Sequence, residues 1–318
     1  MTSYVIRRIL QGVLIIFLVT VMVFLFIRLL PGDPLTIYLN KTDMQQLTDE
    51  QLQELRIRFG LEKTLPQQYV NWVGGLFKGD FGRSVFYDTS VGLLVKEKMP
   101  VTLYLGFLAF VLSGVVGITF GVICALKRGT WIDTLVTLLA NIGVTMPSFW
   151  VGIILIFLFS VKAGWLPVGG YTSPFVDFWK STRQIIMPVT CLSLFSIASL
   201  TRLTRSSMLE VISQDYIRTA WSKGLKERLI ITRHTIKNAL IPVITVIGLQ
   251  VAFIFGGSVL IESVFNIGGV GRLMTQAVQN QDYLIVQAGT LIIAVMVVVS
   301  NLVVDISYGW LDPRIRFD

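Results

Sequence analysis

Few residues in this sequence are able to do acid–base, nucleophilic or metal chemistry. His234 is the only histidine, and the two cysteines, Cys124 and Cys191, each lie inside an apolar run. A catalytic triad, a CxxC metal site or a disulfide framework needs more of these residues or a different spacing. The pattern GxxxxGK[ST], in which glycines and a lysine hold the phosphates of ATP, does not occur. The sequence therefore predicts no catalytic residues, no metal site and no cofactor in this chain.

Charge is concentrated instead in the stretch from Arg202 to Pro242, which lies between two strongly apolar runs. Its acidic residues are Glu210, Asp215 and Glu227, and its basic residues are Arg202, Arg205, Arg218, Lys223, Lys226, Arg228, Arg233 and Lys237. A polar segment between membrane spans must lie in water, and an excess of lysine and arginine predicts the cytoplasmic side. This stretch is therefore a candidate surface for a cytoplasmic partner.

The same stretch has the pattern of a helix, a break and a second helix. Residues 215–223 are expected to form the first helix and residues 226–234 the second, with Gly224 at the break. Asp215 stands where it would cap the first helix and favour its dipole. Tyr216 and Ala220 are four residues apart and share one helix face. Simple capping and packing would also explain these residues, so both explanations stay open.

The composition indicates that membrane spans carry this stretch. The chain of 318 residues is 53% hydrophobic and 14% charged, with a mean hydropathy of +0.71, whereas a soluble domain has about 25% charged residues. The net charge of +8 is best explained by basic residues retained on the cytoplasmic side, not by binding to nucleic acid. We expect an all-α polytopic membrane protein in contact with lipid and with no nucleic acid.

Six apolar runs are long enough to cross a membrane. They cover residues 9–27, 101–126, 134–161, 185–200, 239–261 and 284–301. Pro147 is expected to kink the third run. Basic residues before the first run and after the last predict that both termini lie in the cytoplasm. The predicted divisions are an N-terminal span (1–30), an external helical segment (31–100), a five-helix core (101–310) that includes the cytoplasmic loop 202–238, and a cytoplasmic tail (311–318).

The external segment is expected to contain two short helices. Thr48 and Gln51 have capping-box spacing at the start of the first helix, which Gly60 ends. Pro66 opens the second helix, which has Tyr69, Trp72 and Leu76 on one face. This segment is either a cap packed on the membrane domain or a contact surface for an external partner, and both roles are compatible.

Polar side chains inside the spans are candidates for a wet path across the membrane. The candidates are Asn141, Thr145, Ser148, Ser193, Ser196 and Gln250. Hydrogen bonding between helices is the simpler role for any one of them. Charged residues are scarce within the spans, which argues against a proton- or ion-coupled secondary transporter. In the external connector of residues 262–282, Glu262, Gly268, Gly269 and Gly271 are either part of a flexible link or contacts for an external partner.

Several motifs resemble the first (B-type) permease of the dipeptide/oligopeptide/nickel family of ABC importers. In the cytoplasmic loop they are Asp215 to Ala220 (DYIRTA), Lys223 to Leu225 (KGL), and Asn238 to Leu240 (NAL). Elsewhere they include Leu30 to Pro34 (LPGDP), Met146 to Trp150 (MPSFW), Glu262 to Phe265 (ESVF), and Asp312 to Arg316 (DPRIR). Their order and spacing cover nearly the whole chain. The loop resembles the family's EAA motif, although Arg218-Thr219-Ala220 stands where Glu-Ala-Ala is usual.

The resemblance implies the type I ABC importer permease fold with six transmembrane helices, and an ATP-driven import function. It implies four kinds of partner: a homologous second permease that forms a heterodimer, two cytoplasmic ATPase subunits that bind ATP and Mg²⁺, an external solute-binding protein, and membrane lipid. By resemblance, Asp215, Tyr216, Thr219, Ala220 and Gly224 form the ATPase-docking site. The location would be a bacterial or archaeal plasma membrane, the inner membrane in Gram-negative cells.

Two other function classes are weighed against this one. A stand-alone secondary transporter or channel predicts coupling charges and an internal repeat, and the sequence displays neither. A membrane enzyme needs a convergent catalytic set, which one histidine and two cysteines within spans do not supply. The solute stays open among dipeptides, oligopeptides, nickel complexes, glutathione, haem and some sugars.

Overall fold

The computed structural model describes residues 2–29, 53, 62–84 and 86–311. This part of the chain is helical, and its one extended pairing is a single bridge between Arg83 and Ser90. The elements are α1 (Thr2–Leu29), α4 (Leu65–Phe77), α5 (Val91–Leu126), α6 (Trp131–Thr145), α7 (Ser148–Leu155), the π-helix η1 (Ile156–Lys162), α8 (Phe178–Ile212), α9 (Asp215–Ser222), α10 (Glu227–Leu229), the π-helix η2 (Ile230–Thr235), α11 (Ile236–Val264), α12 (Val270–Gln279) and α13 (Tyr283–Leu311).

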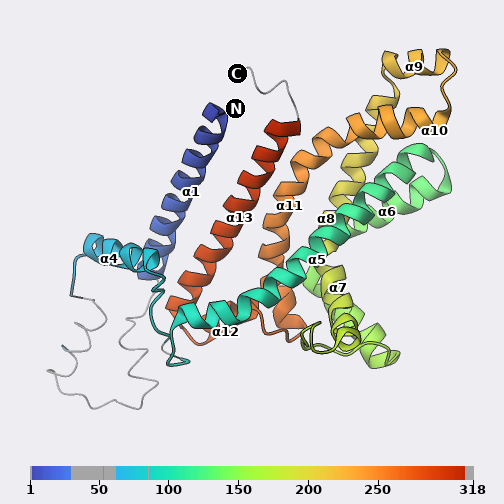
Figure 1. Ribbon diagram of the computed structural model, residues 1–318. Helices are drawn as coiled ribbons and strands as arrows, with labels where there is room; N and C mark the ends of the chain where they lie inside the picture. Colours follow the sequence, from blue (N-terminus) through green and yellow to red (C-terminus); the bar gives the residue numbers. More distant parts are fainter. Residues whose placement is uncertain (1, 30–52, 54–61, 85, 312–318) are drawn as a thin grey trace.

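Five helical segments of the described chain are long and apolar enough to cross a membrane. They lie in α1, α5, α8, α13 and the continuous rod formed by α10, η2 and α11, and the bent pair of α6 with α7–η1 makes a sixth if it counts as one span. The predicted all-α polytopic fold is confirmed. Figure 1 shows that the start of α1, the end of α13 and α9 lie at the same end of the molecule.

The third predicted span, residues 134–161, is broken rather than kinked. Helices α6 and α7–η1 meet at an angle of 109°. Met146 has φ −80° and ψ 131°, an extended conformation, because a residue that precedes proline is driven out of the helical region. Pro147 then supplies no N–H to continue the hydrogen-bond ladder. The chain therefore turns sharply at these two residues.

The fourth span is much longer than the predicted residues 185–200. Helix α8 has 35 residues, and Arg202 and Arg205 lie within it. The predicted loop 202–238 therefore begins as helix and leaves the helix only after Ile212. Helix α8 is the most buried span and contacts α5, α6, α7 and α11. It approaches α5 closely at Gly117, where an added Cβ would lie 2.8 Å from the Leu200 Cβ.

At the opposite end from α9, the external segment packs against the spans. Helix α4, the second predicted helix of this segment, begins with a capping box between Thr64 and Gln67 that was not predicted. Its Tyr69 and Trp72 rings lie 5.4 and 6.0 Å from the Phe24 ring of α1, and the Tyr69 hydroxyl lies 2.8 Å from that of Thr20. Helix α4 therefore packs against α1, and the role of the whole segment as a cap or a contact surface stays a prediction.

The external segment ends earlier in the sequence than predicted. Helix α5 starts at Val91 and contains Pro100, so the segment ends about ten residues before the predicted boundary at residue 100. The predicted helix from Thr48 to Gly60, the motif at Leu30 to Pro34 and the tail 312–318 lie outside the described residues.

Candidate functional site

Helix α9 and the turn after it form the exposed tip of the molecule at the end where α1 begins (Figure 1). The predicted helix at residues 215–223 is confirmed, with Gln214 as its N-cap. Asp215 lies in the first turn instead of capping, and its carboxylate is 3.5 Å from the Arg218 guanidinium on the exposed surface. Exposed pairs of this kind contribute little to stability, so Asp215 remains free to contact a partner.

One face of α9 is buried inside the loop. Ile217 and Ala220 pack against Ile230 of η2 and Val211 of α8. Tyr216 and Thr219 are exposed. Ala220, predicted to share a helix face with Tyr216, lies instead on the inner face with Ile217, which precedes it by three residues. The small side chain of Ala220 allows α9 to lie close to Ile230 and Val211.

The predicted break at Gly224 is confirmed. Its φ is +74°, and a Cβ placed there would meet no atom within 4 Å. The requirement for glycine is thus conformational, since side chains disfavour positive φ. The Leu225 N–H donates to the Ala220 carbonyl, 3.4 Å away, and closes the turn.

Trp221 is a further candidate that sequence reasoning missed. Its side chain is 49% exposed, and that of Tyr216 is 45% exposed. Large aromatic side chains on a polar, exposed helix are typical of protein interfaces. The signal in the sequence is a tryptophan set between charged residues rather than at the end of an apolar run.

The loop is joined directly to a span. The second predicted helix, residues 226–234, does not end before the next span: α10 and η2 continue directly into α11. The Asn238 amide of α11 donates to the Tyr216 hydroxyl, 3.3 Å away, and ties α9 to that span. Helix α9 is therefore connected to α11 both along the chain and through this hydrogen bond.

The predicted path residues divide into two groups. Ser196 donates to the Gln250 carbonyl oxygen (3.0 Å), Ser193 donates to the Thr190 carbonyl, and Thr145 donates within its own helix. These four side chains are explained by hydrogen bonding within and between helices. Asn141 and Ser148 instead line open pockets, of about 580 and 270 Å³ respectively.

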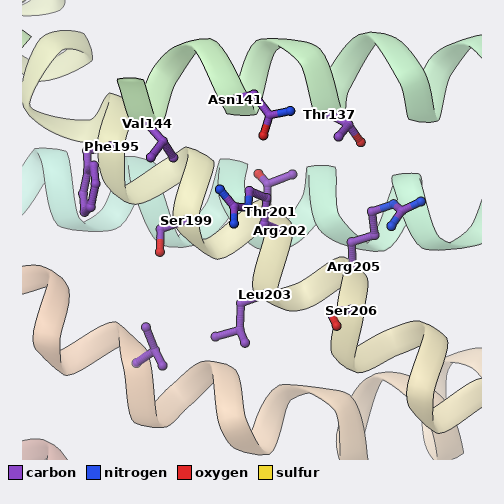
Figure 2. A pocket seen from close by; sticks show the side chains of 11 residues that line it. Thr137, Asn141, Val144, Phe195, Ser199, Thr201, Arg202, Leu203, Arg205 and Ser206 are labelled. Atoms are coloured by element: carbon purple, nitrogen blue, oxygen red, sulfur yellow. The ribbon is translucent and has the colours of Figure 1, made fainter. Parts of the chain in front are cut away.

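The larger pocket lies between α6, α8 and α11 (Figure 2). Beside it, the Arg205 guanidinium makes a two-point contact with the Asp133 carboxylate, at 2.7 and 2.9 Å. Asp133 is buried, and the Gly129 N–H also donates to it at 3.1 Å. This pair fixes α6 to α8 and was not foreseen, because 72 residues separate its members.

In the external connector, the structure places Glu262 inside the molecule rather than on a contact surface. Its carboxylate accepts from the Thr102 hydroxyl of α5 (2.7 Å) and the Arg272 N–H of α12 (3.0 Å), and the Thr102 oxygen accepts from the Val270 N–H (2.9 Å). The arrangement satisfies N–H groups at the first turn of α12, which have no partner within the helix.

The glycines beside Glu262 are explained by close packing. A Cβ at Gly269 would lie 2.6 Å from the Thr102 hydroxyl oxygen, and one at Gly271 would lie 2.6 Å from the Val259 Cα. Both residues are buried, whereas Gly268 is partly exposed and meets nothing within 4 Å. An external contact in this connector is thus left to Gly268 among the residues predicted for it.

A second buried carboxylate anchors the external loop before α5. Asp282, which follows α12, accepts from the Ser84 hydroxyl (2.5 Å) and the Phe86 N–H (3.1 Å). The Tyr87 hydroxyl donates to the Gln276 side chain at 3.1 Å. The loop before α5, helix α12 and the start of α13 are therefore held together at this end of the molecule.

Comparisons with known proteins agree with this architecture. Residues 117–317 match the family of binding-protein-dependent transport system inner membrane components, and residues 1–106 match the N-terminal family of such components. The chain is 39% identical over 320 residues to the oligopeptide transport system permease protein AppB of Bacillus subtilis. It is 40% identical over 321 residues to a Brucella abortus (strain 2308) protein named as a peptide transport system permease. Both alignments cover all of each chain.

Among solved structures, the fold is similar to that of the MetNI methionine ABC transporter in an inward-facing form. The TM-score is 0.54 at 17% identity, and the match covers 69% of this chain and 97% of the other. The family match covers more than half of the chain, and the full-length relatives are well above 30% identical. The chain therefore belongs to the binding-protein-dependent transport system inner membrane components, as a permease subunit of an ABC importer.

Proposed function

We propose that this chain is one of two permease subunits of an importer that carries peptides into the cell. A homologous permease forms the other half of the path, two ATPase subunits dock in the cytoplasm, and a solute-binding protein delivers the peptide outside. The observation that carries the proposal is α9, an exposed helix with Tyr216 and Trp221 on its surface, joined to α11. The peptide assignment is supported by the names of the full-length relatives.

The loop supports a mechanism of mechanical coupling. ATP and Mg²⁺ are held by the ATPase subunits, whose closure draws the two docked α9 helices toward each other. Because α9 is tied to α11 through Tyr216 and the η2 segment, the span moves with it. Binding of ATP thus shifts the population between inward-open and outward-open states. In the outward-open state the path accepts the peptide, and ATP hydrolysis then restores the inward-open state.

The orientation follows from the charge distribution. α9 and its neighbouring basic residues lie at one end of the molecule together with the start of α1 (Figure 1). The positive-inside rule favours the cytoplasm for that end. Cysteine introduced at Lys226 is expected to escape an impermeant label in spheroplasts, and cysteine at Lys63 is expected to react.

Reconstitution tests the whole proposal. The chain is purified with its second permease and the two ATPases, placed in vesicles, and supplied with the binding protein and a radiolabelled peptide. Uptake is expected to need ATP and every component. Uptake by this chain alone, or uptake driven by an ion gradient without ATPases, would instead identify a secondary transporter.

A further inference from the structure

The pocket of about 580 Å³ has the size of a small-molecule site. Figure 2 shows Asn141 of α6 on one side and Ser199, Arg202 and Ser206 of α8 on the other, with α11 along the third side. The hydrogen bond from Gln250 of α11 to the Ser199 hydroxyl, 3.2 Å long, holds that side in place. Three spans thus enclose an open cavity with polar groups on its walls.

The charge of this pocket is positive. Arg205 is neutralised by Asp133. The Arg202 guanidinium is exposed and makes no ion pair or hydrogen bond with another described residue, and none of the described residues lining the pocket is acidic. One uncompensated positive charge therefore faces the cavity. A guanidinium with no acidic neighbour in a cavity with partly apolar walls attracts anions, so the pocket is suited to an anionic group.

The other lining groups are suited to a peptide backbone. Asn141 has an exposed amide that both donates and accepts, and Thr137 and Ser206 supply hydroxyl groups. Phe195, Val144 and Val246 provide apolar surface around them. These groups match the amides and the carboxylate that all peptides have in common.

We infer that this pocket binds the C-terminal carboxylate of the peptide in transit, with Arg202 as its anchor. The inference rests on the proposed function and adds a binding station within the permease itself. A guanidinium matches a carboxylate with two parallel hydrogen bonds. Because peptides differ in side chains but share this terminus, an anchor of this type guides many sequences along one path.

A lipid phosphate is the other anion that could reach an arginine in a span. Arg202 precedes the end of α8 by ten residues, which corresponds to about 15 Å of helix rise. It also lies on the most buried of the spans, between α6 and α11. The position favours a solute inside the bundle over a headgroup at its edge.

The test uses the assembled complex of permeases and ATPases in nanodiscs without the binding protein. Binding of trialanine and of trialanine amide is measured by equilibrium dialysis. The wild type is expected to bind the free carboxylate at least about tenfold more tightly than the amide, as for a charge-assisted pair. Arg202→Gln is expected to abolish this preference, and Arg202→Lys to retain part of it. The same substitution at Arg128, exposed outside the pocket, should leave the preference unchanged.

A second variant, at a different residue, makes the test independent of any effect that substitution of Arg202 has on folding. Asn141→Asp places a negative charge on the opposite wall and should also remove the preference for the carboxylate. The inference is overturned if the wild type binds neither probe, or binds both equally, or if both variants keep the preference. It is also overturned if Arg202→Gln loses only co-purified phosphatidylglycerol in native mass spectrometry. ATP-dependent uptake by the wild type, measured separately, would still support the importer assignment in each of these cases.

Discussion

At the C-terminal end of α11, the outer end in the proposed topology, Glu262 is fully buried and joins three helices through hydrogen bonds. At its inner end, α9 is held by a small apolar cluster and one hydrogen bond from Asn238 to Tyr216, and most of its surface is exposed. The first region satisfies its polar groups within one chain. The second leaves a helix with large aromatic side chains in water.

This difference indicates where the subunit is complete and where it needs a partner. A buried network fixes one geometry, because each unsatisfied polar group would cost free energy. A small satellite cluster permits local opening while the spans stay folded. Substitutions at the outer end should therefore affect the whole chain, and substitutions in the loop should affect assembly first. The following predictions run from the largest expected effect on chain stability to the smallest.

Glu262→Ala is expected to have the largest effect. It leaves the Thr102 hydroxyl and the Arg272 N–H without their acceptor in a buried site, at a cost of about 1–3 kcal/mol for each group. The midpoint of thermal aggregation, followed by fluorescence-detected gel filtration, should fall markedly. Glu210→Ala, on the exposed surface of α8, is the matched control and should leave the midpoint within error. Equal midpoints for both variants would show that the network is dispensable.

Ala220→Glu should have a smaller effect, confined to the loop. It forces a carboxylate against Ile217 and Ile230, but the loop can open without unfolding the spans, which limits the cost. Faster trypsin cleavage at Lys223 and Lys226 is expected, together with loss of the ATPases on purification. Thr219→Glu, on the exposed face, should leave the cleavage rate unchanged. If both variants are cleaved at the same rate, the assignment of inner and outer faces is incorrect.

Gly224→Val should loosen the turn by about 1–2 kcal/mol, since a β-branched residue is strained at positive φ. No atom lies near the added Cβ, so strain is the whole of the effect. Hydrogen exchange over residues 215–235 should become faster. Gly224→Asn serves as the control, because asparagine tolerates this conformation, and it should exchange at nearly the wild-type rate. Identical exchange for both variants would argue against strain at this turn.

Trp221→Ala should change chain stability least, within about 0.5 kcal/mol, as for other exposed sites. Its expected effect is on assembly: truncation of an interface aromatic typically weakens binding by about 1–2 kcal/mol or more. Titration of the permease pair with ATPase, followed by fluorescence anisotropy, measures this change. Trp131→Ala, also exposed but at the start of α6, should bind ATPase normally. Unchanged affinity in Trp221→Ala would remove this residue from the docking surface.

Local signals predicted much of the fold. The apolar runs identified the spans, and Gly224 marked the break after α9. A span and a turn are each specified by residues that are close together in the sequence. The extension of α8 through Arg205 was not predicted, since the charge of Arg205 is neutralised by Asp133, which is distant in sequence. The burial of Glu262 depends likewise on Thr102, 160 residues away. Helix α9, with eight residues, is too short for its periodicity to identify the buried side of Ala220.

The continuity of α10, η2 and α11 has a mechanical consequence. The rod runs from Glu227 to Val264 and meets α13 near its middle, where a Cβ at Gly248 would lie 2.5 Å from a Val304 methyl group. Figure 1 shows that this segment bends along its length, and α11 contains Pro242. Because Gly248 leaves no space between the two helices, a movement of α11 at this point would carry α13 with it.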